Sequence, residues 1–303
     1  MQCVNIVSKK WKGKIITYPC GKCAACLSNR RQEWTARLII EDKHSQSSNF
    51  LTITYDERHK PTVLYKPPNE ESFLLGTLSK DHIQLFLKSL RRKQERYELR
   101  EKLPHWKIRY FIAGEYGSKT LRPHYHAIMF NVRRHIIQDI ASVWKKGSID
   151  VGTVTPQSIS YTAKYIISKD DILEELPGLP DNFQKAFALM SKGYTRDGKM
   201  HTPPLGCQYV ESHKEYHIRS KDIKVNAAGS TYAMPKIYKK KIFGINSQTI
   251  INNELQQKND FRIKTREKEL KKMGYKSPFK SREEQDRENY EKIKSKAKAN
   301  TKL

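Results

Sequence analysis

The middle of the chain carries the pattern that most restricts its fold. Two runs with the composition of β-strands, residues 106–115 and 124–130, are separated by a short segment containing Gly117 and Ser118. Glycine and serine at this position are typical of a hairpin loop, and strands joined by so short a loop pair antiparallel. The sequence therefore predicts an antiparallel hairpin at the centre of the fold.

Elements of alternating type flank this hairpin. The run Phe50–Tyr55 has strand composition, and a helix capped by Ser79 follows it, with apolar residues at positions i, i+3, i+4 and i+7. After the hairpin come a helix over 136–144, a strand over 148–154 and a helix over 158–169. The order β-α-β-β-α-β predicts a ferredoxin-like α+β fold, in which helices cover one face of an antiparallel sheet and the other face can hold a site.

Outside this core the chain is less regular. We expect a helix over 28–41, another near 182–192 and a strand-like stretch at 207–210. Composition divides the chain into four expected parts: a cysteine cluster with the first helix (1–45), the core (46–170), a mixed extension of unassigned role (171–235) and a lysine-rich tail (236–303). The tail could bind nucleic acid or simply keep the protein in solution.

The charge balance indicates a polyanionic partner. The 303 residues include 58 Lys and Arg against 32 Asp and Glu, a formal net charge of +26, and nucleic acid is the commonest partner of so basic a chain. An anionic membrane surface is the rival, but the sequence has no amphipathic helix with an exposed aromatic or leucine face. It also has no run of ~20 apolar residues and no signal-peptide pattern, so we expect neither a membrane-spanning nor a secreted protein.

A pair of histidines lies in the second strand of the hairpin. Alternate side chains of a strand share a face, so His124 and His126 point the same way, and Glu115, at the end of the preceding strand, can lie beside them. Two imidazoles and one carboxylate on one face of a sheet make a divalent-metal site with open coordination positions. Taken alone, the pattern also fits two ordinary histidines of a basic protein.

The last predicted helix of the core carries two tyrosines. Tyr161 and Tyr165 are spaced i, i+4 and share one helix face, with Lys164 between them and Lys169 a turn further on. A phenol can act as a covalent nucleophile, and at a phosphodiester it needs a Lewis acid and cations that stabilise the phosphate or protonate a leaving oxygen. Tyrosines at this spacing more often serve packing, but beside the histidine pair they favour a catalytic interpretation.

Four of the five cysteines lie near the start of the sequence. Cys20, Cys23 and Cys26 follow a Cys-x2-Cys-x2-Cys pattern, and Cys3 could complete a set of four. A structural zinc ion suits this set better than an iron–sulfur cluster, although the paired halves of common zinc ribbons are missing, and reduced cysteines packed in a turn are the alternative. Cys207 stands alone and is expected to be a buried apolar thiol.

Together these motifs resemble a known family, the His-hydrophobic-His endonucleases that start rolling-circle replication. The similar segments are Gly114-Glu115-Tyr116, Arg122-Pro123-His124-Tyr125-His126 and Tyr161-Thr-Ala-Lys-Tyr165. More closely, the chain resembles the replication initiators of microviruses, small single-stranded DNA phages, and of gokushoviruses in particular, to which Pro19–Cys26 is similar as well. The resemblance covers residues 15–170, and the bulky Tyr125 between the histidines is a mild departure from the pattern.

The resemblance implies a site-specific DNA nickase and strand transferase that initiates and terminates rolling-circle replication of a circular DNA. The residues that match the ligands of a catalytic Mg²⁺ or Mn²⁺ are Glu115, His124 and His126, and those that match the two nucleophiles are Tyr161 and Tyr165. In the family a tyrosine attacks a phosphodiester, stays on the 5′ phosphate and leaves a 3′-OH for a polymerase. The second tyrosine cuts the regenerated origin, and the freed 3′ end closes the circle.

The implied partners are a single-stranded or supercoiled circular DNA origin and the helicase and DNA polymerase of a bacterial host, in whose cytoplasm the protein would act. A nucleotide is not expected, because Gly193–Met200 departs from a phosphate-binding loop: Met200 replaces the Ser or Thr that would hold magnesium, and Pro203 follows where a helix should begin. Two alternatives stay open, a transposase or plasmid relaxase of the same superfamily and a non-catalytic basic DNA-binding protein.

Overall fold

The computed structural model describes residues 3, 6–11, 14–117, 120–165, 176–196, 199–244 and 268. The chain divides into two compact units. Unit 1 comprises Met1–Ala36 and Tyr209–Leu303, and unit 2 comprises Arg37–Gln208. Among the described helices, none combines the length and the apolar character needed to cross a membrane.

The described part of the chain contains both helices and strands. The helices are α1 (Ala24–His44), α2 (Lys80–Arg100), α3 (Arg134–Gln138), α4 (Ala141–Trp144), α5 (Pro156–Lys164) and α7 (Gln208–Ser220). The strands are β1 (Ile6–Trp11), β2 (Lys14–Pro19), β3 (Ser48–Thr54), β4 (Thr62–Tyr65), β5 (Phe73–Gly76), β6 (Arg109–Tyr116), β7 (Pro123–Phe130), β8 (Ile149–Thr153), β9 (Phe187–Met190), β10 (Tyr194–Arg196), β11 (Lys199–Thr202), β12 (Lys224–Ala227) and β13 (Ser230–Ala233).

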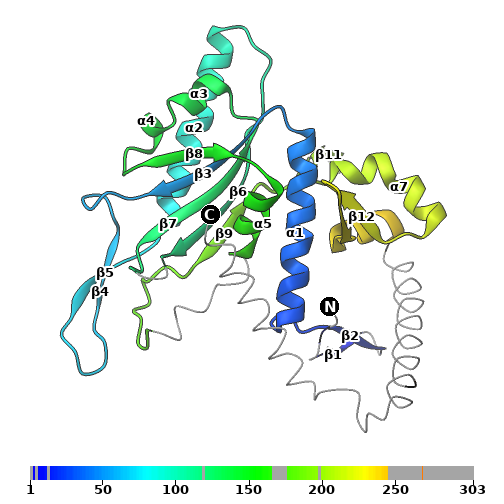
Figure 1. Ribbon diagram of the computed structural model, residues 1–303, viewed down its shortest axis with the longest axis horizontal. Helices are drawn as coiled ribbons and strands as arrows, with labels where there is room; N and C mark the ends of the chain where they lie inside the picture. The colour runs from blue at the N-terminus through cyan, green and yellow to red at the C-terminus, as the bar shows by residue number, and fades with distance from the viewer. Residues whose placement is uncertain are drawn as a thin grey trace. The chain divides into compact units, whose positions relative to one another are not determined.

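Unit 2 is built around a five-stranded antiparallel sheet in the order β8-β3-β7-β6-β9 (Figure 1). β6 and β7 form the predicted central hairpin. α2 connects β3 to β6, and α3 and α4 connect β7 to β8, so the expected order of elements and the antiparallel sheet of an α+β fold are confirmed. In addition, β9 forms a fifth strand at the β6 edge, and the hairpin β4–β5 is inserted before α2.

One face of the sheet packs on α2, α3 and α4. The odd-numbered residues of β7 point to this face, where Tyr125, Ala127 and Met129 are fully buried. As predicted, Ser79 caps α2, because its Oγ accepts a hydrogen bond from the N–H of His82 at 3.2 Å. Burying an apolar side chain contributes about 1.5–3 kcal/mol, and α2 supplies a buried stripe at the predicted spacing: Ile83, Phe86, Leu87 and Leu90.

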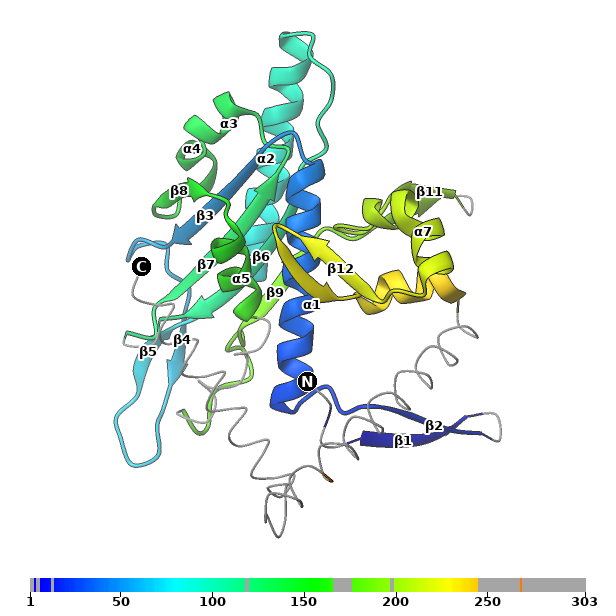
Figure 2. The same cartoon turned by 45° about the vertical axis from the view of Figure 1, so that its right-hand side comes forward.

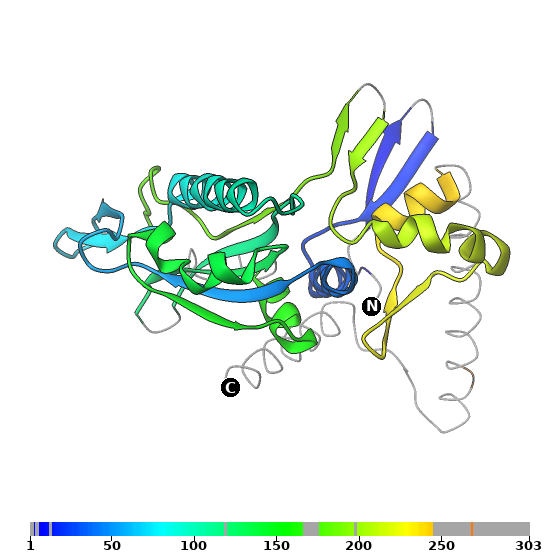
Figure 3. The same ribbon diagram turned by 90° about the horizontal axis from the view of Figure 1, so that it is seen from above.

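The opposite face is partly covered by α5 and by the last part of α1, so it is less open than expected. α5 contacts β6 and β7 (Figure 2), and α2 and α5 lie on opposite sides of the sheet when the molecule is seen from above (Figure 3). From α1, Glu41 forms a buried ion pair with Arg109 of β6, with 3.0 Å between Oε1 and Nε. The even-numbered residues of β7, which include both histidines, point to this face.

Two expectations for the region after the core were wrong. Residues 182–192 do not form a helix, because Phe187–Met190 pairs as β9 with the open edge of β6, whose backbone N–H and C=O groups need partners. The segment 207–210 leads into the helix α7 rather than a strand, because the aromatic spacing continues beyond it: Tyr209 stacks on His213 and hydrogen-bonds His217. The helix expected over 136–144 is divided into α3 and α4.

Unit 1 includes the start of the expected basic tail. Residues 236–244 are helical, and Tyr238 and Ile242 are buried. The Tyr238 ring stacks on Tyr209 of α7, with 5.5 Å between ring centroids. These residues therefore belong to a folded unit, whereas the rest of the tail, apart from Lys268, lies outside the described residues.

Candidate active site

The three predicted metal ligands meet near the ends of β6 and β7. Strand register places Glu115 directly opposite His124, and His126 lies two residues along on the same face of the sheet. Glu115 Oε1 is 2.7 Å from His124 Nε2 and 3.0 Å from His126 Nε2. The side chains are 13%, 20% and 8% exposed, respectively, so the cluster is largely shielded from water while one edge stays accessible.

Each histidine is also held through its other ring nitrogen. His124 Nδ1 donates to the carbonyl oxygen of Arg122 at 3.1 Å, and His126 Nδ1 lies 3.3 Å from Thr52 Oγ1. A hydrogen bond at Nδ1 fixes the orientation of the ring and leaves Nε2 facing Glu115. Such contacts are typical of histidines that bind a metal ion through Nε2.

Aromatic rings enclose His126. Phe50 of β3 stacks on the imidazole with 5.6 Å between centroids, and Tyr165 stacks on it at 5.4 Å. Tyr161 meets the same ring edge-on at 5.2 Å. These contacts restrict the rotation of His126, so its Nε2 is oriented before any ligand arrives.

Phe50 and Thr52 are the site residues that the sequence interpretation missed. Both belong to the predicted strand over 50–55, and they alternate with the fully buried Leu51 and Ile53, which point to the other face. That alternation was visible in the sequence. The sequence does not show that β3 pairs with β7, and this pairing is what places Thr52 opposite His126.

Burial and mutual contact shift the acid–base properties of the cluster. Burial by itself would raise the pKa of Glu115, but hydrogen bonds with His124 and His126 outweigh it and hold that pKa below its usual value. Burial would lower the pKa of His124, and the hydrogen bond to Glu115 raises that pKa above its usual value. The carboxylate is therefore ionised at neutral pH at the point where the two imidazoles meet.

The spacing of these donors fits a single divalent cation. Ligand atoms about 2.1 Å from an octahedral ion lie roughly 3 Å apart, close to the 2.7 and 3.0 Å that separate Glu115 Oε1 from the two Nε2 atoms. Within the described part of the chain, no further His, Cys, Asp or Glu joins this group. Three protein ligands leave positions open for water or substrate.

Both predicted nucleophiles lie beside this cluster. α5 is fixed at its start by Thr155, whose Oγ1 accepts a hydrogen bond from the N–H of Ser158. The helix ends at Lys164, earlier than expected, and Tyr165 is its C-cap residue. The i, i+4 spacing still places Tyr161 and Tyr165 together, with 5.1 Å between their ring centroids.

The two phenols differ in accessibility. Tyr165 is 8% exposed, and burial, followed by the negative charge of Glu115, raises its pKa. Tyr161 is partly exposed, and burial raises its pKa as well. Lys164 Nζ lies 5.9 Å from the ring centroid of Tyr161 and 5.7 Å from that of Tyr165, so one cation is near both phenols. Lys169 lies outside the described residues.

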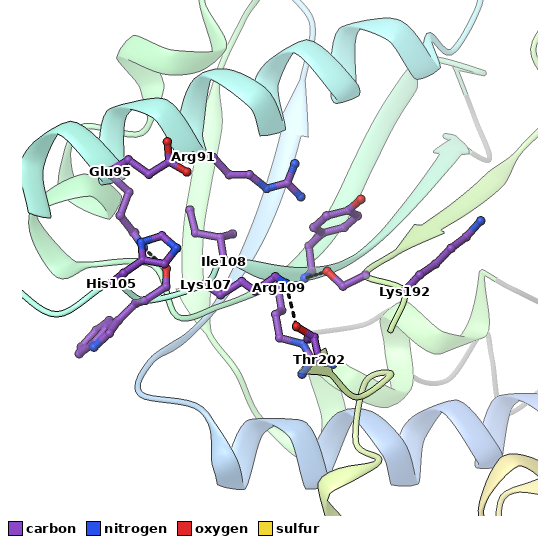
Figure 4. A pocket seen from close by; sticks show the side chains of 12 residues that line it. Arg91, Glu95, His105, Lys107, Ile108, Arg109, Lys192 and Thr202 are labelled. Atoms are coloured by element: carbon purple, nitrogen blue, oxygen red, sulfur yellow. Dashed lines mark hydrogen bonds between the residues drawn. The ribbon is translucent and has the colours of Figure 1, made fainter. Parts of the chain in front are cut away.

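A basic hollow of 460 Å³ lies at the opposite end of β6 (Figure 4). Lys107 Nζ donates to Thr202 Oγ1 there at 2.8 Å, and the guanidinium of Arg91 lies over the Tyr110 ring. Six residues of strand, about 20 Å, separate Arg109 in this hollow from Glu115. The hollow contains none of the predicted site residues, and its cations come from segments too far apart in the sequence to be grouped in advance.

The predicted cysteine cluster forms in unit 1. The Sγ atoms of Cys3, Cys20, Cys23 and Cys26 lie within 4.8 Å of one another, and none of the four forms a disulfide. Cys207 is buried, as expected of an apolar thiol.

Residues 48–171 match the profile of a family described as replication-associated proteins of the ORF2 type. The chain is 28% identical over 244 residues to Replication-associated protein ORF2 of Spiroplasma virus 4, an alignment that covers 74% of this chain and 67% of that protein. It is 33% identical over 175 residues to Replication-associated protein VP4 of Bdellovibrio phage phiMH2K, with 50% and 48% covered. The expected resemblance to the replication proteins of small single-stranded DNA phages is therefore confirmed.

A third relative, Replication-associated protein ORF4 of Chlamydia phage 1, is 25% identical over 240 residues and 52% covered, so the chain spans about half the length of two of these relatives. Among solved structures, the N-terminal nuclease domain of non-structural protein-1 of minute virus of mice is similar over 61% of this chain and 83% of that chain. The two chains share 10% sequence identity, and the TM-score is 0.20. The family match itself includes the whole Glu–His–His cluster and both tyrosines.

Proposed function

We propose that this protein, whose residues 48–171 match a replication-associated family, is a metal-dependent DNA endonuclease and strand transferase that initiates and terminates rolling-circle replication. The observation that carries the proposal is the packing of two tyrosine rings against one histidine of a three-ligand cation site. If the two tyrosines served only to pack the core, they would not need a carboxylate and two oriented imidazoles beside them.

Glu115, His124 and His126 would hold Mg²⁺ or Mn²⁺. A cation bound there would act as a Lewis acid that polarises a phosphoryl oxygen. The imidazoles and the carboxylate need no rearrangement for this, since their ligand atoms already face one another. The second contacts of both rings keep them in that orientation.

In the proposed reaction the phenol oxygen of one tyrosine attacks the phosphorus of a DNA phosphodiester. The bond from phosphorus to the 3′ oxygen breaks, which leaves a 5′-phosphotyrosine and a free 3′-OH. The phenol loses its proton to water, and the 3′ oxygen must gain one. Lys164, near both phenols, is placed to stabilise the charge on the phosphate or to donate that proton.

Two tyrosines serve a reaction with two successive cuts. A tyrosine that already carries a DNA strand cannot attack again, so the second cut needs a second phenol near the same cation. Tyr161 and Tyr165 meet this requirement because both contact His126. Tyr161 is the more exposed of the two, and we assign the first attack to it.

The DNA partner is supported by charge. Besides the net charge of +26, α2 carries a row of exposed cations on the sheet face opposite the site: Lys88, Arg91, Arg92, Arg96 and Arg100. Cations of this kind bind phosphates without regard to sequence. We therefore propose a circular single-stranded or supercoiled origin as substrate, with the helicase and polymerase of an infected bacterium acting on it in the host cytoplasm.

Covalent attachment to DNA tests the proposal. The full chain is incubated with Mn²⁺ and single-stranded oligonucleotides that tile the genome encoding it, and adducts are mapped by mass spectrometry. We expect a nucleotide adduct on Tyr161 or Tyr165, some single-round cleavage in each single Tyr→Phe variant, and none in the double variant. Phe keeps the ring packing, so the double variant should stay folded.

Tyr97→Phe is the matched control, because Tyr97 is a partly buried tyrosine of α2 outside the site. It should form adducts like the unmodified chain. A folded double variant that still becomes attached to DNA would overturn the proposal. DNA binding without any adduct would favour the non-catalytic alternative, and insertion of the cut strand into a second DNA would favour a transposase.

A further inference from the structure

The four cysteines of unit 1 form a group that the proposed nuclease chemistry does not use. Cys3 precedes the hairpin β1–β2, Cys20 and Cys23 lie between β2 and α1, and Cys26 lies in the first turn of α1. Cys23 and Cys26 are buried, and Cys3 and Cys20 pack against them. Thiols from both sides of a hairpin are thus gathered at one point.

Three of the six sulfur–sulfur separations match the edges of a tetrahedron around a single ion, and all six are within 4.8 Å. Four thiolates bound to zinc at about 2.3 Å lie roughly 3.8 Å apart along the edges of the tetrahedron. The Sγ–Sγ distances are 3.6 Å for Cys3–Cys20, 3.9 Å for Cys20–Cys26 and 3.9 Å for Cys3–Cys23. A disulfide would bring two sulfurs to about 2.05 Å, and the cysteines of a multi-iron cluster bind different iron atoms and are held apart by it.

The backbone around Cys20 is arranged to stabilise thiolates. Gly21 has a φ of +78°, a conformation that a side chain would strain. Beyond this turn, the N–H groups of Lys22 and Cys23 point at Cys20 Sγ, with donor–sulfur distances of 3.5 and 3.4 Å. The N–H of Cys20 in turn points at Cys3 Sγ at 3.3 Å. Donors aimed at sulfur favour its ionised, metal-binding form.

A cation stands near the cluster to offset its charge. Zinc with four thiolates carries a formal charge of −2, which is stabilised by neighbouring positive groups. The guanidinium of Arg30 lies over the Gly21 turn, with Nη2 4.0 Å from where a Cβ on Gly21 would stand. Lys22, inside the Cys20–Cys23 loop, is exposed and adds a second positive charge.

We propose that Cys3, Cys20, Cys23 and Cys26 bind one structural zinc ion that fastens the base of the hairpin β1–β2 to the start of α1. A two-stranded hairpin is marginal by itself in water, and a metal that closes the 17-residue separation between Cys3 and Cys20 adds its binding free energy to folding. The site does not depend on the proposed nuclease function, because all its ligands lie in unit 1.

Metal analysis and cobalt exchange test the proposal on the full chain. Purified without chelators, the protein should contain about one zinc per chain that a His124→Ala, His126→Ala variant retains. Exchange with Co²⁺ should give thiolate-to-cobalt charge-transfer absorption together with the visible bands of tetrahedral Co²⁺. The Glu–His–His cluster has no thiolate and cannot produce that charge-transfer signal.

Cys23→Ser should lose most of the charge-transfer signal, and Cys207→Ser, which changes a buried thiol outside the cluster, should keep it. If Cys23→Ser fails to fold, the spectrum and metal content of the unmodified chain still decide the matter. Bound iron, a disulfide among the four cysteines, or cobalt bands without charge transfer would each overturn the proposal. None of these outcomes would alter the tyrosine–DNA adduct that tests the nuclease function.

Discussion

In the described part of unit 2, the carboxylates of Glu98 and Glu115 are both shielded from water and both contact histidine, but their surroundings differ in kind. Glu98 of α2 accepts hydrogen bonds from the N–H of Trp106 and from Arg133 Nε, both at 3.0 Å, and pairs with His105 at 2.8 Å. Glu115 meets two imidazoles through one oxygen, Oε1. The first carboxylate is paired with a guanidinium, which is permanently charged, whereas both partners of the second are imidazoles, which are common metal ligands.

The difference separates a structural carboxylate from a candidate metal ligand. The guanidinium of Arg133 is fixed over the Trp106 ring at 3.6 Å, so the cation that balances Glu98 is part of the fold. Around Glu115 the partners are two imidazoles, and a metal ion bound by all three side chains would supply the balancing charge. Glu98 and Glu115 therefore look alike as shielded Glu–His contacts, but the second arrangement brings together three ligand atoms that one metal ion could share.

The largest effect should come from removing one imidazole of the Glu115 cluster. His126→Ala should lower metal-dependent cleavage roughly a thousand-fold, because a cation held there would contribute several kcal/mol to stabilising the transition state. DNA affinity should stay close to that of the unmodified chain. His105→Ala, at the Glu98 cluster, is the control and should cleave normally. Cleavage rates and filter binding measure both. A His126→Ala variant that cleaves at the unmodified rate would show that the site is misassigned.

Glu98→Gln should have the opposite effect to His126→Ala: it should lower stability without lowering the rate of cleavage. Removing this charge leaves Arg133 without its anionic partner in a buried setting, and we expect the free energy of unfolding to fall by about 3 kcal/mol, as measured by urea denaturation. Metal-dependent cleavage by the folded fraction should be unchanged. Loss of cleavage without loss of stability would break the distinction between the two carboxylates.

The contribution of Glu98 to stability should depend on pH. Burial would raise the pKa of Glu98, but its bonds to Trp106, Arg133 and His105 hold it below its usual value. A lowered folded pKa contributes stability that is present above the ordinary Glu value of about 4.3 and is lost as the pH falls through the folded value. The unmodified chain should therefore lose more stability between pH 5 and acid conditions than Glu98→Gln does.

Metal binding should stabilise the chain, and this stabilisation should depend on Glu115 but not on Glu98. At a Mn²⁺ concentration 100 times the Kd, binding to the folded state adds about 2.7 kcal/mol to the free energy of unfolding. Glu115→Gln should lose this increment and Glu98→Gln should keep it, as followed by thermal unfolding with and without Mn²⁺. An increment that survives in Glu115→Gln would place the ion elsewhere.

The smallest effect concerns binding outside both clusters. Truncation after Gly244 removes most of the lysine-rich tail but keeps the buried Tyr238 and Ile242 and the stacking of Tyr238 on Tyr209. For each phosphate that the shortened chain no longer binds, the slope of log affinity against log salt should flatten by about 0.9 on duplex DNA. Fluorescence anisotropy over a series of salt concentrations measures this slope. An unchanged slope would assign the tail to solubility.

The site was predictable where local geometry sets the direction of a side chain. Strand alternation places His124 and His126 on one face, and helical spacing does the same for Tyr161 and Tyr165, so these residues could be grouped without the fold. Thr52 could not be assigned to them, because its place beside His126 depends on the pairing of β3 with β7.

In the fold, too, local patterns were predictable from the sequence and long-range pairings were not. The element order of the core was evident from local patterns, and the antiparallel sheet agrees with it. The strand β9 was misread as a helix because its conformation depends on the open edge of β6, to which it pairs across more than 70 residues. The sequence likewise does not show that Cys3 joins the other cysteines, because 17 positions separate it from Cys20. The pairing of β1 with β2 brings the two together.

The parallel contact between Tyr165 and His126 has a consequence for the order of events in replication. In the proposed reaction, a DNA strand esterified to Tyr165 would change the surroundings of an imidazole that is a proposed metal ligand, whereas Tyr161 meets that ring edge-on. The two phenols are thus placed differently against His126, and a strand attached to Tyr165 would disturb the proposed metal site more than a strand attached to Tyr161. If the proposed function holds, opening the origin and sealing the finished circle would then proceed at different rates, according to which tyrosine carries the strand.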